Sequence, residues 1–258
     1  MIHITEIQQV LAVISGLVVG FSLGLIGGGG SILAVPLLLY VVGIHNPHLV
    51  IGSTALAVAV NAYLNLIPHW RSGNVQWPPA IAFAIPGAIG AFVGSSMGKM
   101  VNGKSLLFLF GILMILVAIM MLKPQTRVGR IHFRWTNRMF LRVVLSGLTV
   151  GAVSGFFGIG GGFLIVPGLI ISTGMPLIYA IGSSLVSVGT FGLTTAVNYA
   201  FSGLVLWTIV AEYVIGGVIG GVLGARLANR LGKHARLLNY VFSGVVMVVG
   251  IYMLTRNL

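Results

Sequence analysis

Two glycine clusters hold the residues whose types and spacing best suit ligand binding. One comprises Gly27, Gly28, Gly29 and Gly30, followed by Ser31, and the other comprises Gly158, Gly160, Gly161 and Gly162. Each cluster precedes a short apolar stretch, so each predicts a helix N-terminus, whose free N–H groups and positive dipole end attract an anion. Consecutive glycines weaken a helix on all its sides, and helix packing alone explains them poorly. We therefore expect unwound backbone at both clusters, lining a site for a small anion.

Paired hydroxyl side chains follow each cluster at equivalent positions, and amide side chains lie further along the same apolar stretches. The hydroxyl pairs are Ser53 with Thr54 and Ser183 with Ser184, and the amides are Asn61, Asn65 and Asn198. Each hydroxyl pair follows a glycine at the start of an apolar stretch, where it either caps that helix or donates hydrogen bonds to an anion. The amides lie at intramembrane depth, where they either bond to a neighbouring helix or line a polar cavity.

Glu212 is the one acidic residue inside an apolar stretch, which makes it a candidate for proton coupling. It stands only five residues after Trp207, so it could instead reach the membrane interface or pair with Arg71. The chain has two acidic residues, both Glu, and no cysteine, which leaves almost no material for di-acid, triad or Mg²⁺ chemistry. The histidines lack metal-ligand spacing as well. We expect neither an enzyme nor a bound metal or cofactor.

The elements that position these residues are membrane helices. Hydrophobic residues make up 57% of the chain and charged residues only 6%, far below the roughly one quarter typical of soluble domains. The net charge of +12 comes from Lys and Arg in the joints between apolar runs, not from a basic face. Nucleic-acid binding is therefore not expected, and the lipid bilayer is the surrounding medium.

The apolar stretches form two copies of one unit. GLVVGFSLGLIGGGGSILAVP at 16–36 matches GLTVGAVSGFFGIGGGFLIVP at 147–167 at an offset of 131, and from Gly52 and Gly182 onward the offset is 130. We predict a first repeat at 1–123, a basic cytoplasmic linker at 124–138 and a second repeat at 139–258. Each repeat holds about five hydrophobic segments, of which the second is short.

The short segments, at about 31–43 and 162–173, are predicted to be half-helices or re-entrant partners, because full crossing takes about 20 residues. The glycines spaced by four residues in the first segment of each copy are expected to pack against other helices; they are Gly16, Gly20, Gly24, Gly147, Gly151 and Gly155. Paired glycine breaks in two repeats are typical of secondary transporters.

The basic residues favour inverted repeats. If the first two segments of each copy return the chain to its starting side, eleven charges lie inside and three outside, whereas parallel repeats give eight against six. The first distribution obeys the positive-inside rule. We therefore predict an all-α polytopic membrane protein with inverted repeats, glycine-broken half-helices near the midplane and both termini outside.

The sequences GLIGGGGSILAVPLLL and GFFGIGGGFLIVPGLI, followed by IGSTALAVAVNA and IGSSLVSVGT, resemble the TauE/SafE-type sulfite exporter family of prokaryotic membrane proteins. The resemblance implies a permease of the bacterial cytoplasmic membrane for sulfite, thiosulfate, sulfonates or related organic anions. We expect it to work by alternating access. A channel-like or structural subunit serving a partner protein is the alternative. The anion, direction, coupling ion and oligomeric state, including a homo-oligomer, are left open.

Overall fold

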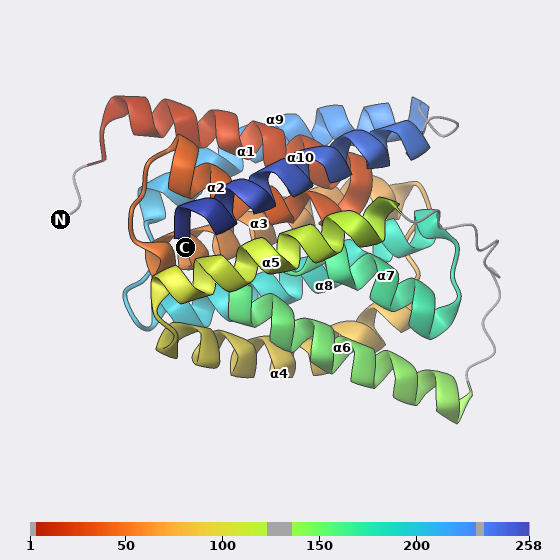
Figure 1. Ribbon diagram of the computed structural model, residues 1–258. Helices are drawn as coiled ribbons and strands as arrows, with labels where there is room; N and C mark the ends of the chain where they lie inside the picture. The colour runs from red at the N-terminus through yellow and green to blue at the C-terminus, as the bar shows by residue number, and fades with distance from the viewer. Residues whose placement is uncertain (1–3, 123–135, 231–234, 258) are drawn as a thin grey trace.

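The protein is a bundle of helices, seen here in a computed structural model that describes residues 4–122, 136–230 and 235–257 (Figure 1). No strand occurs in those ranges. Among the described residues, eight helices are long and apolar enough to cross a membrane: α1 (Glu6–Ile26), α3 (Pro47–Arg71), α4 (Trp77–Met100), α5 (Gly103–Leu122), α6 (Asn137–Phe157), α8 (Leu177–Ala200), α9 (Trp207–Arg230) and α10 (Ala235–Asn257). The all-helical polytopic fold predicted from the sequence is confirmed.

Two shorter apolar elements complete the bundle, one in each copy. The first runs through a 3₁₀ helix at Gly27–Leu33, helix α2 (Ala34–Pro36) and a π-helical turn at Leu37–Val41, and the second is α7 (Gly162–Thr173). The predicted shortness of both second segments is thus confirmed. Of the predicted linker, residues 124–135 lie outside the described residues, and the two repeat boundaries stay a prediction.

α3 and α8 form the centre of the molecule. They carry the two largest buried shares of the eight candidate spans, 67% and 56%. α3 begins after an Asn46 cap, whose side chain accepts from two backbone N–H groups, with Pro47 in the first turn. These helices contact each other with Gly192 against Ala55 and Gly52 against Tyr199, so they run antiparallel.

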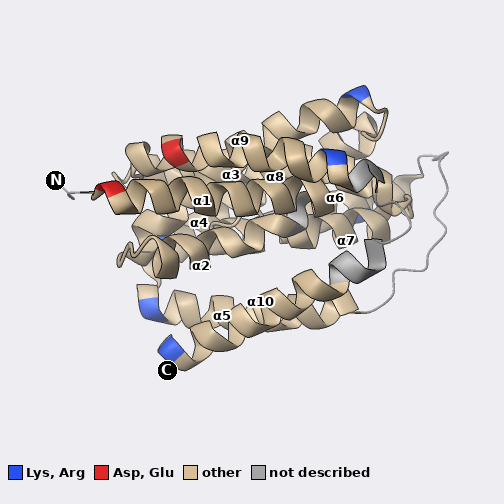
Figure 2. Ribbon diagram, turned by 90° about the horizontal axis from the view of Figure 1, so that it is seen from above, with Lys and Arg blue, Asp and Glu red and all other residues tan. Residues whose placement is uncertain are grey.

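α5 and α10 make a second antiparallel pair, set to one side of the rest (Figure 2). Gly111 lies against Gly250, and the Ser243 hydroxyl donates to the Ala118 carbonyl at 2.7 Å. α3 corresponds to α8, and α5 to α10, in the sequence repeat. Helices in corresponding positions therefore run in opposite directions.

Closely packed glycines join the remaining helices in two matching pairs. Gly20 and Gly24 of α1 lie against Gly217 and Gly221 of α9. In the other pair Gly151 of α6 lies against Gly87 of α4, again with backbone where a side chain would stand. The predicted packing role of these spaced glycines is confirmed, because any Cβ would enter the partner's backbone.

The chain ends and charges divide between two ends of the bundle. α1 and α3 both begin at the end where α10 finishes, and α5 finishes at the opposite end (Figure 1). Lys99, Lys104 and Arg256 lie toward the first end, because α4 and α10 finish there and α5 begins there. Arg71 and Arg226 lie toward the second, where α3 and α9 finish (Figure 2). The first two segments of each copy thus return to their starting end; which end is cytoplasmic stays a prediction.

Candidate functional site

The two glycine clusters differ in backbone conformation. Gly27 ends α1 with a φ of 73°, and the residues after it wind into the 3₁₀ helix instead of unwinding. The second cluster does leave the helix, since Gly158, Gly160 and Gly161 have φ of 67°, 68° and 63°. Unwound backbone was therefore predicted wrongly for the first cluster, where 3₁₀ bonds every third residue replace the helical ones. It is confirmed for the second.

Both clusters pack against the central helices α3 and α8. A Cβ at Gly27 would meet Ile181 at 2.8 Å, and a Cβ at Gly158 would meet Ile51, the residue equivalent to Ile181 in the other copy. A Cβ at Gly160 would meet Val58 and Val188, each at 3.2 Å, and these two valines are equivalent as well. Gly160 therefore lies between matching positions of the two copies.

The other members of the clusters are buried where they are described. Gly30 lies against Ser22 and Gly161 against Ser154, while Ser31 is fully buried. Gly162 is the first residue of α7 and is also buried. The surroundings of Gly28 and Gly29 lie outside what the structure describes.

The N-terminus of α7 has no side-chain cap. Its N-cap residue is Gly161, in the left-handed conformation that favours glycine, and its first turn is bonded through Leu164 and Ile165 to the Gly161 carbonyl. The first N–H groups of a helix have no intrahelical partner. A partial positive charge thus faces the protein interior beside Gly160.

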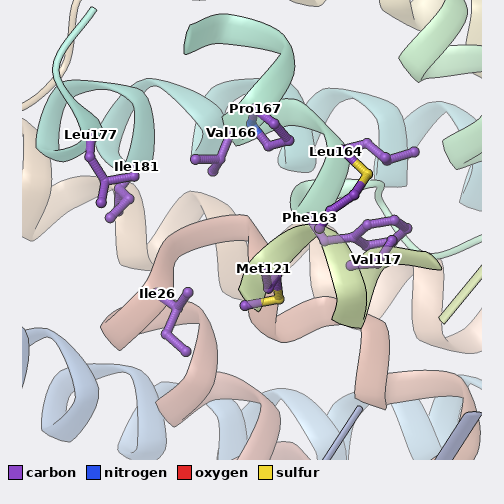
Figure 3. Close-up of a pocket in the computed structure, with 10 residues that line it drawn as sticks. Ile26, Val117, Met121, Phe163, Leu164, Val166, Pro167, Leu177 and Ile181 are labelled. Atoms are coloured by element: carbon purple, nitrogen blue, oxygen red, sulfur yellow. The ribbon is translucent and has the colours of Figure 1, made fainter. Parts of the chain in front are cut away.

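An apolar pocket of about 90 Å³ lies next to both clusters (Figure 3). It is enclosed by α5, α7, the start of α8 and the end of α1, through Ile26, Val117, Met120, Met121, Phe163, Leu164, Val166, Pro167, Leu177 and Ile181. Ile26 directly precedes Gly27, and Phe163 directly follows Gly162. Because no polar side chain is among these residues, this pocket by itself does not suit a charged ligand.

Ser53 and Ser183 make equivalent bonds between the copies. The Ser53 hydroxyl accepts from the Leu206 backbone N–H at 2.8 Å, and the Ser183 hydroxyl accepts from the Gln76 N–H at 2.9 Å. Leu206 and Gln76 directly precede α9 and α4. Both serines are fully buried and lie in the second turn of their own helices. Of the two readings of these serines, capping of their own helix does not hold, because each stabilises the start of a helix in the other copy.

Thr54 and Ser184 bond within their own helices. The Thr54 hydroxyl donates to the Val50 carbonyl at 2.8 Å, and the Ser184 hydroxyl donates to the Ile181 carbonyl at 2.7 Å. Both side chains are fully buried. A role of these four hydroxyls toward an anion stays a prediction.

Asn198 is the centre of a polar network between α8 and α4. Its amide nitrogen donates to the hydroxyls of Ser95 and Ser96 at 2.7 and 2.9 Å. The Lys99 ammonium donates to the Asn198 amide oxygen at 2.8 Å, to its backbone carbonyl at 3.0 Å and to Ser202 at 2.9 Å. Of the two readings of Asn198, interhelical hydrogen bonding holds. Sequence reasoning missed Lys99, because it was counted only as a charge outside the membrane.

Asn61 and Asn65 face α9. The Asn65 amide nitrogen donates to the Asn61 carbonyl at 2.9 Å, and its side chain lies against Gly221. The Asn61 side chain lies against Gly217, and neither its nitrogen nor its oxygen has a hydrogen-bond partner among the described residues. The same is true of the hydroxyl of Tyr213, a fully buried residue on α9 that sequence reasoning also missed.

Glu212 does not pair with Arg71. The two residues belong to opposite ends of the bundle, since α9 begins where α3 does and Arg71 is the last residue of α3 (Figure 1). One carboxylate oxygen of Glu212 is buried without a partner in the described ranges. Of the alternatives for Glu212, pairing with Arg71 does not hold, while proton coupling stays a prediction. In the described part of the chain, no three His or acidic side chains gather as metal ligands.

Comparison with known proteins agrees with this architecture. The family model described as sulfite exporter TauE/SafE matches residues 12–253. The chain belongs to the TauE/SafE family. A probable membrane transporter protein of Xylella fastidiosa (strain Temecula1 / ATCC 700964) is 53% identical over 253 residues, covering 97% of each chain. The probable membrane transporter protein YunE of Bacillus subtilis is 26% identical, covering 80% of this chain and 84% of its own.

A third relative is similar over a shorter part of the chain. A probable membrane transporter protein of Methanocaldococcus jannaschii is 30% identical over 190 residues, covering 72% of this chain and 68% of its own. No solved structure matches the chain. This TauE/SafE protein is thus a multi-pass membrane transporter, and its recognition from the glycine-rich sequences is confirmed.

Proposed function

We propose that this transporter is a permease for a small anion in the bacterial cytoplasmic membrane. The anion is sulfite, thiosulfate, a sulfonate or a related organic anion, and it moves by alternating access between two inverted halves. The observation that carries the proposal is the uncapped N-terminus of α7, which begins at the left-handed Gly161 beside Gly160. Such an N-terminus attracts an anion without a buried Lys or Arg.

The lack of acidic residues supports the choice of an anion. Glu212 is the one acidic residue within the apolar helices apart from Glu6, which is the first residue of α1. A desolvated cation would cost several kcal/mol and would need a countercharge or several carbonyls. A helix N-terminus provides a modest positive potential, which holds an anion and still lets it leave.

The matching contacts of the two copies support alternating access. Counterpart helices α3 and α8 run antiparallel, and the contact of α1 with α9 recurs in the contact of α6 with α4. Two such halves can exchange conformations about a pseudo-twofold axis, so that a central site opens first to one side and then to the other.

Flux through proteoliposomes tests the proposal. We expect saturable uptake of sulfite or thiosulfate that is stimulated by the same anion on the opposite side and competed by short sulfonates, with protein-free liposomes as the control. Anion flux that neither saturates nor responds to exchange would indicate a channel, and no flux of any solute would indicate a structural subunit. Saturable transport of a cation, uninhibited by any oxyanion, would refute the anion site.

A further inference from the structure

One pair of equivalent positions in the core is apolar at one interface between the copies and polar at the other. Between α4 and α8 the rings of Phe83 and Phe191 are stacked, with centroids 6.2 Å apart and Phe191 against Gly87. The offset of 130 places Tyr213 and Asn61 at the matching positions between α9 and α3. The Asn61 amide lies against Gly217, the residue equivalent to Gly87. One interface is therefore apolar where its counterpart carries an amide and a phenol.

The polar pair is buried without partners. Asn61 and Tyr213 are both fully buried, and the amide nitrogen, the amide oxygen and the phenol hydroxyl make no hydrogen bond within the described ranges. A lone buried serine can bond to its own helix by rotating, but a phenol or an amide oxygen cannot. Keeping such groups unpaired at membrane depth is costly, and the Phe pair shows that the fold accommodates an apolar alternative here.

We propose that Asn61 and Tyr213 bind the transported anion, and that the binding site therefore lies at one of the two equivalent interfaces between the copies, the one between α3 and α9. This inference rests on the proposed function. The amide nitrogen offers two N–H donors and the phenol one O–H donor, which suit the oxygens of a sulfur oxyanion. Neutral donors hold an anion less tightly than Lys or Arg, so it can leave again.

The position of the pair suits a site that closes during transport. Asn61 lies against α9 at Gly217, so substrate reaches the amide when α9 moves away from α3. α9 packs along α1 through Gly20 and Gly24, so the two helices move as one unit. The apolar interface of Phe83 and Phe191 has no group to present to an anion and provides the fixed counterpart.

Tyr213→Phe and Asn61→Leu test the inference in the full-length protein. We expect each to lower kcat/KM for sulfite or thiosulfate about tenfold to a hundredfold, the effect of losing a hydrogen bond to a charged group. Because each change removes an unpaired buried polar group, the melting temperature in detergent without anion should stay the same or rise. Tyr63→Phe is the matched control. Its hydroxyl bonds to Thr190 at 3.2 Å and is outside the site, so KM should not change.

The increase in melting temperature that an anion causes in the purified protein is the second measurement. Sulfite should raise the melting temperature of the wild type and of Tyr63→Phe. It should raise the melting temperature of Tyr213→Phe much less. Anion transport that is normal in both site variants would overturn the inference and leave the proposed function intact. A wild type that neither transports nor is stabilised by any oxyanion would overturn both. Reduced kcat/KM accompanied by an equal loss of thermal stability would assign the pair a structural role and also overturn the inference.

Discussion

Replacing Ser53 and Ser183 by alanine should destabilise the protein. Each hydroxyl is the hydrogen-bond acceptor of a backbone N–H that begins a helix in the other copy, at 2.8 and 2.9 Å. The alanine variants leave the N–H of Leu206 or Gln76 unpaired beside a fully buried position. We expect about 2 kcal/mol for each single change, within the range of about 1–3 kcal/mol for an unsatisfied buried donor.

The two losses should add. Ser53 lies near the start of α3 and Ser183 near the start of α8, at opposite ends of the bundle, and they share no partner (Figure 1). Independent sites add to within about 0.5 kcal/mol, so the double variant should lose about 4 kcal/mol. For a chain of this size each single change corresponds to a drop of about 4–8 °C in melting temperature.

Thermal unfolding in detergent, with transport of the folded fraction measured in parallel, checks the magnitude. Ser184→Ala is the matched control, because its hydroxyl donates to the Ile181 carbonyl of its own helix and its loss leaves no donor unpaired. We expect that variant to melt within about 2 °C of the wild type, since Ala is the better helix former. Ser53→Ala and Ser183→Ala variants that match Ser184→Ala in stability but show a raised KM would refute the structural role.

Three further predictions concern the ends and centre of the bundle. A reporter in the central linker should score cytoplasmic and one at the C-terminus external, and a shared side would contradict the predicted orientation. Gly160→Ala should lower both stability and flux, because its Cβ would meet two valines at 3.2 Å. Gly174→Ala is the control, because Gly174 has a φ of 72° and open space around it. That change should cost only the backbone strain of about 1–2 kcal/mol and leave KM unchanged. If Gly160→Ala and Gly174→Ala had equal effects on stability and flux, the contact of Gly160 with the two valines would not explain the result. Lys99→Met should destabilise the protein by about 1–3 kcal/mol, because three hydrogen bonds at the end of α8 are lost. Thermal melts of Lys104→Met provide the control, because Lys104 is an exposed residue at the same end of the bundle.

Much of the fold could be predicted from the sequence because membrane helices have long apolar segments of fixed length. The short second segments were evident because each falls well below the roughly 20 residues of a full crossing. The packing role of Gly20 and Gly151 followed from their spacing, since residues four apart share one helix face. The backbone of the first cluster was not predictable in this way, because four glycines allow a 3₁₀ helix as readily as an open turn.

The partners of the polar side chains could not be predicted, because they depend on contacts between distant segments. Ser53 was expected either to cap its own helix or to bind an anion, but the bond in the structure is to Leu206, 153 residues away. The network of Asn198 with Lys99 likewise joins two helices whose proximity no local pattern indicates. Tyr213 gave no signal either, since one tyrosine in an apolar helix is unremarkable until its neighbours are known.

The comparison of the two copies separates residues that the fold needs from residues that it does not. Where both copies need the same contact they keep the same residue, as Ser53 and Ser183 do at the helix starts. Where the copies differ in the buried core, an apolar pair is enough for folding, as the stacked rings of Phe83 and Phe191 indicate. The unpaired polar groups of Tyr213 and Asn61 cost free energy, and the apolar pair at the equivalent positions does not have this cost. A duplicated transporter can thus bind its substrate at one of the two equivalent interfaces between its copies and keep the other interface apolar.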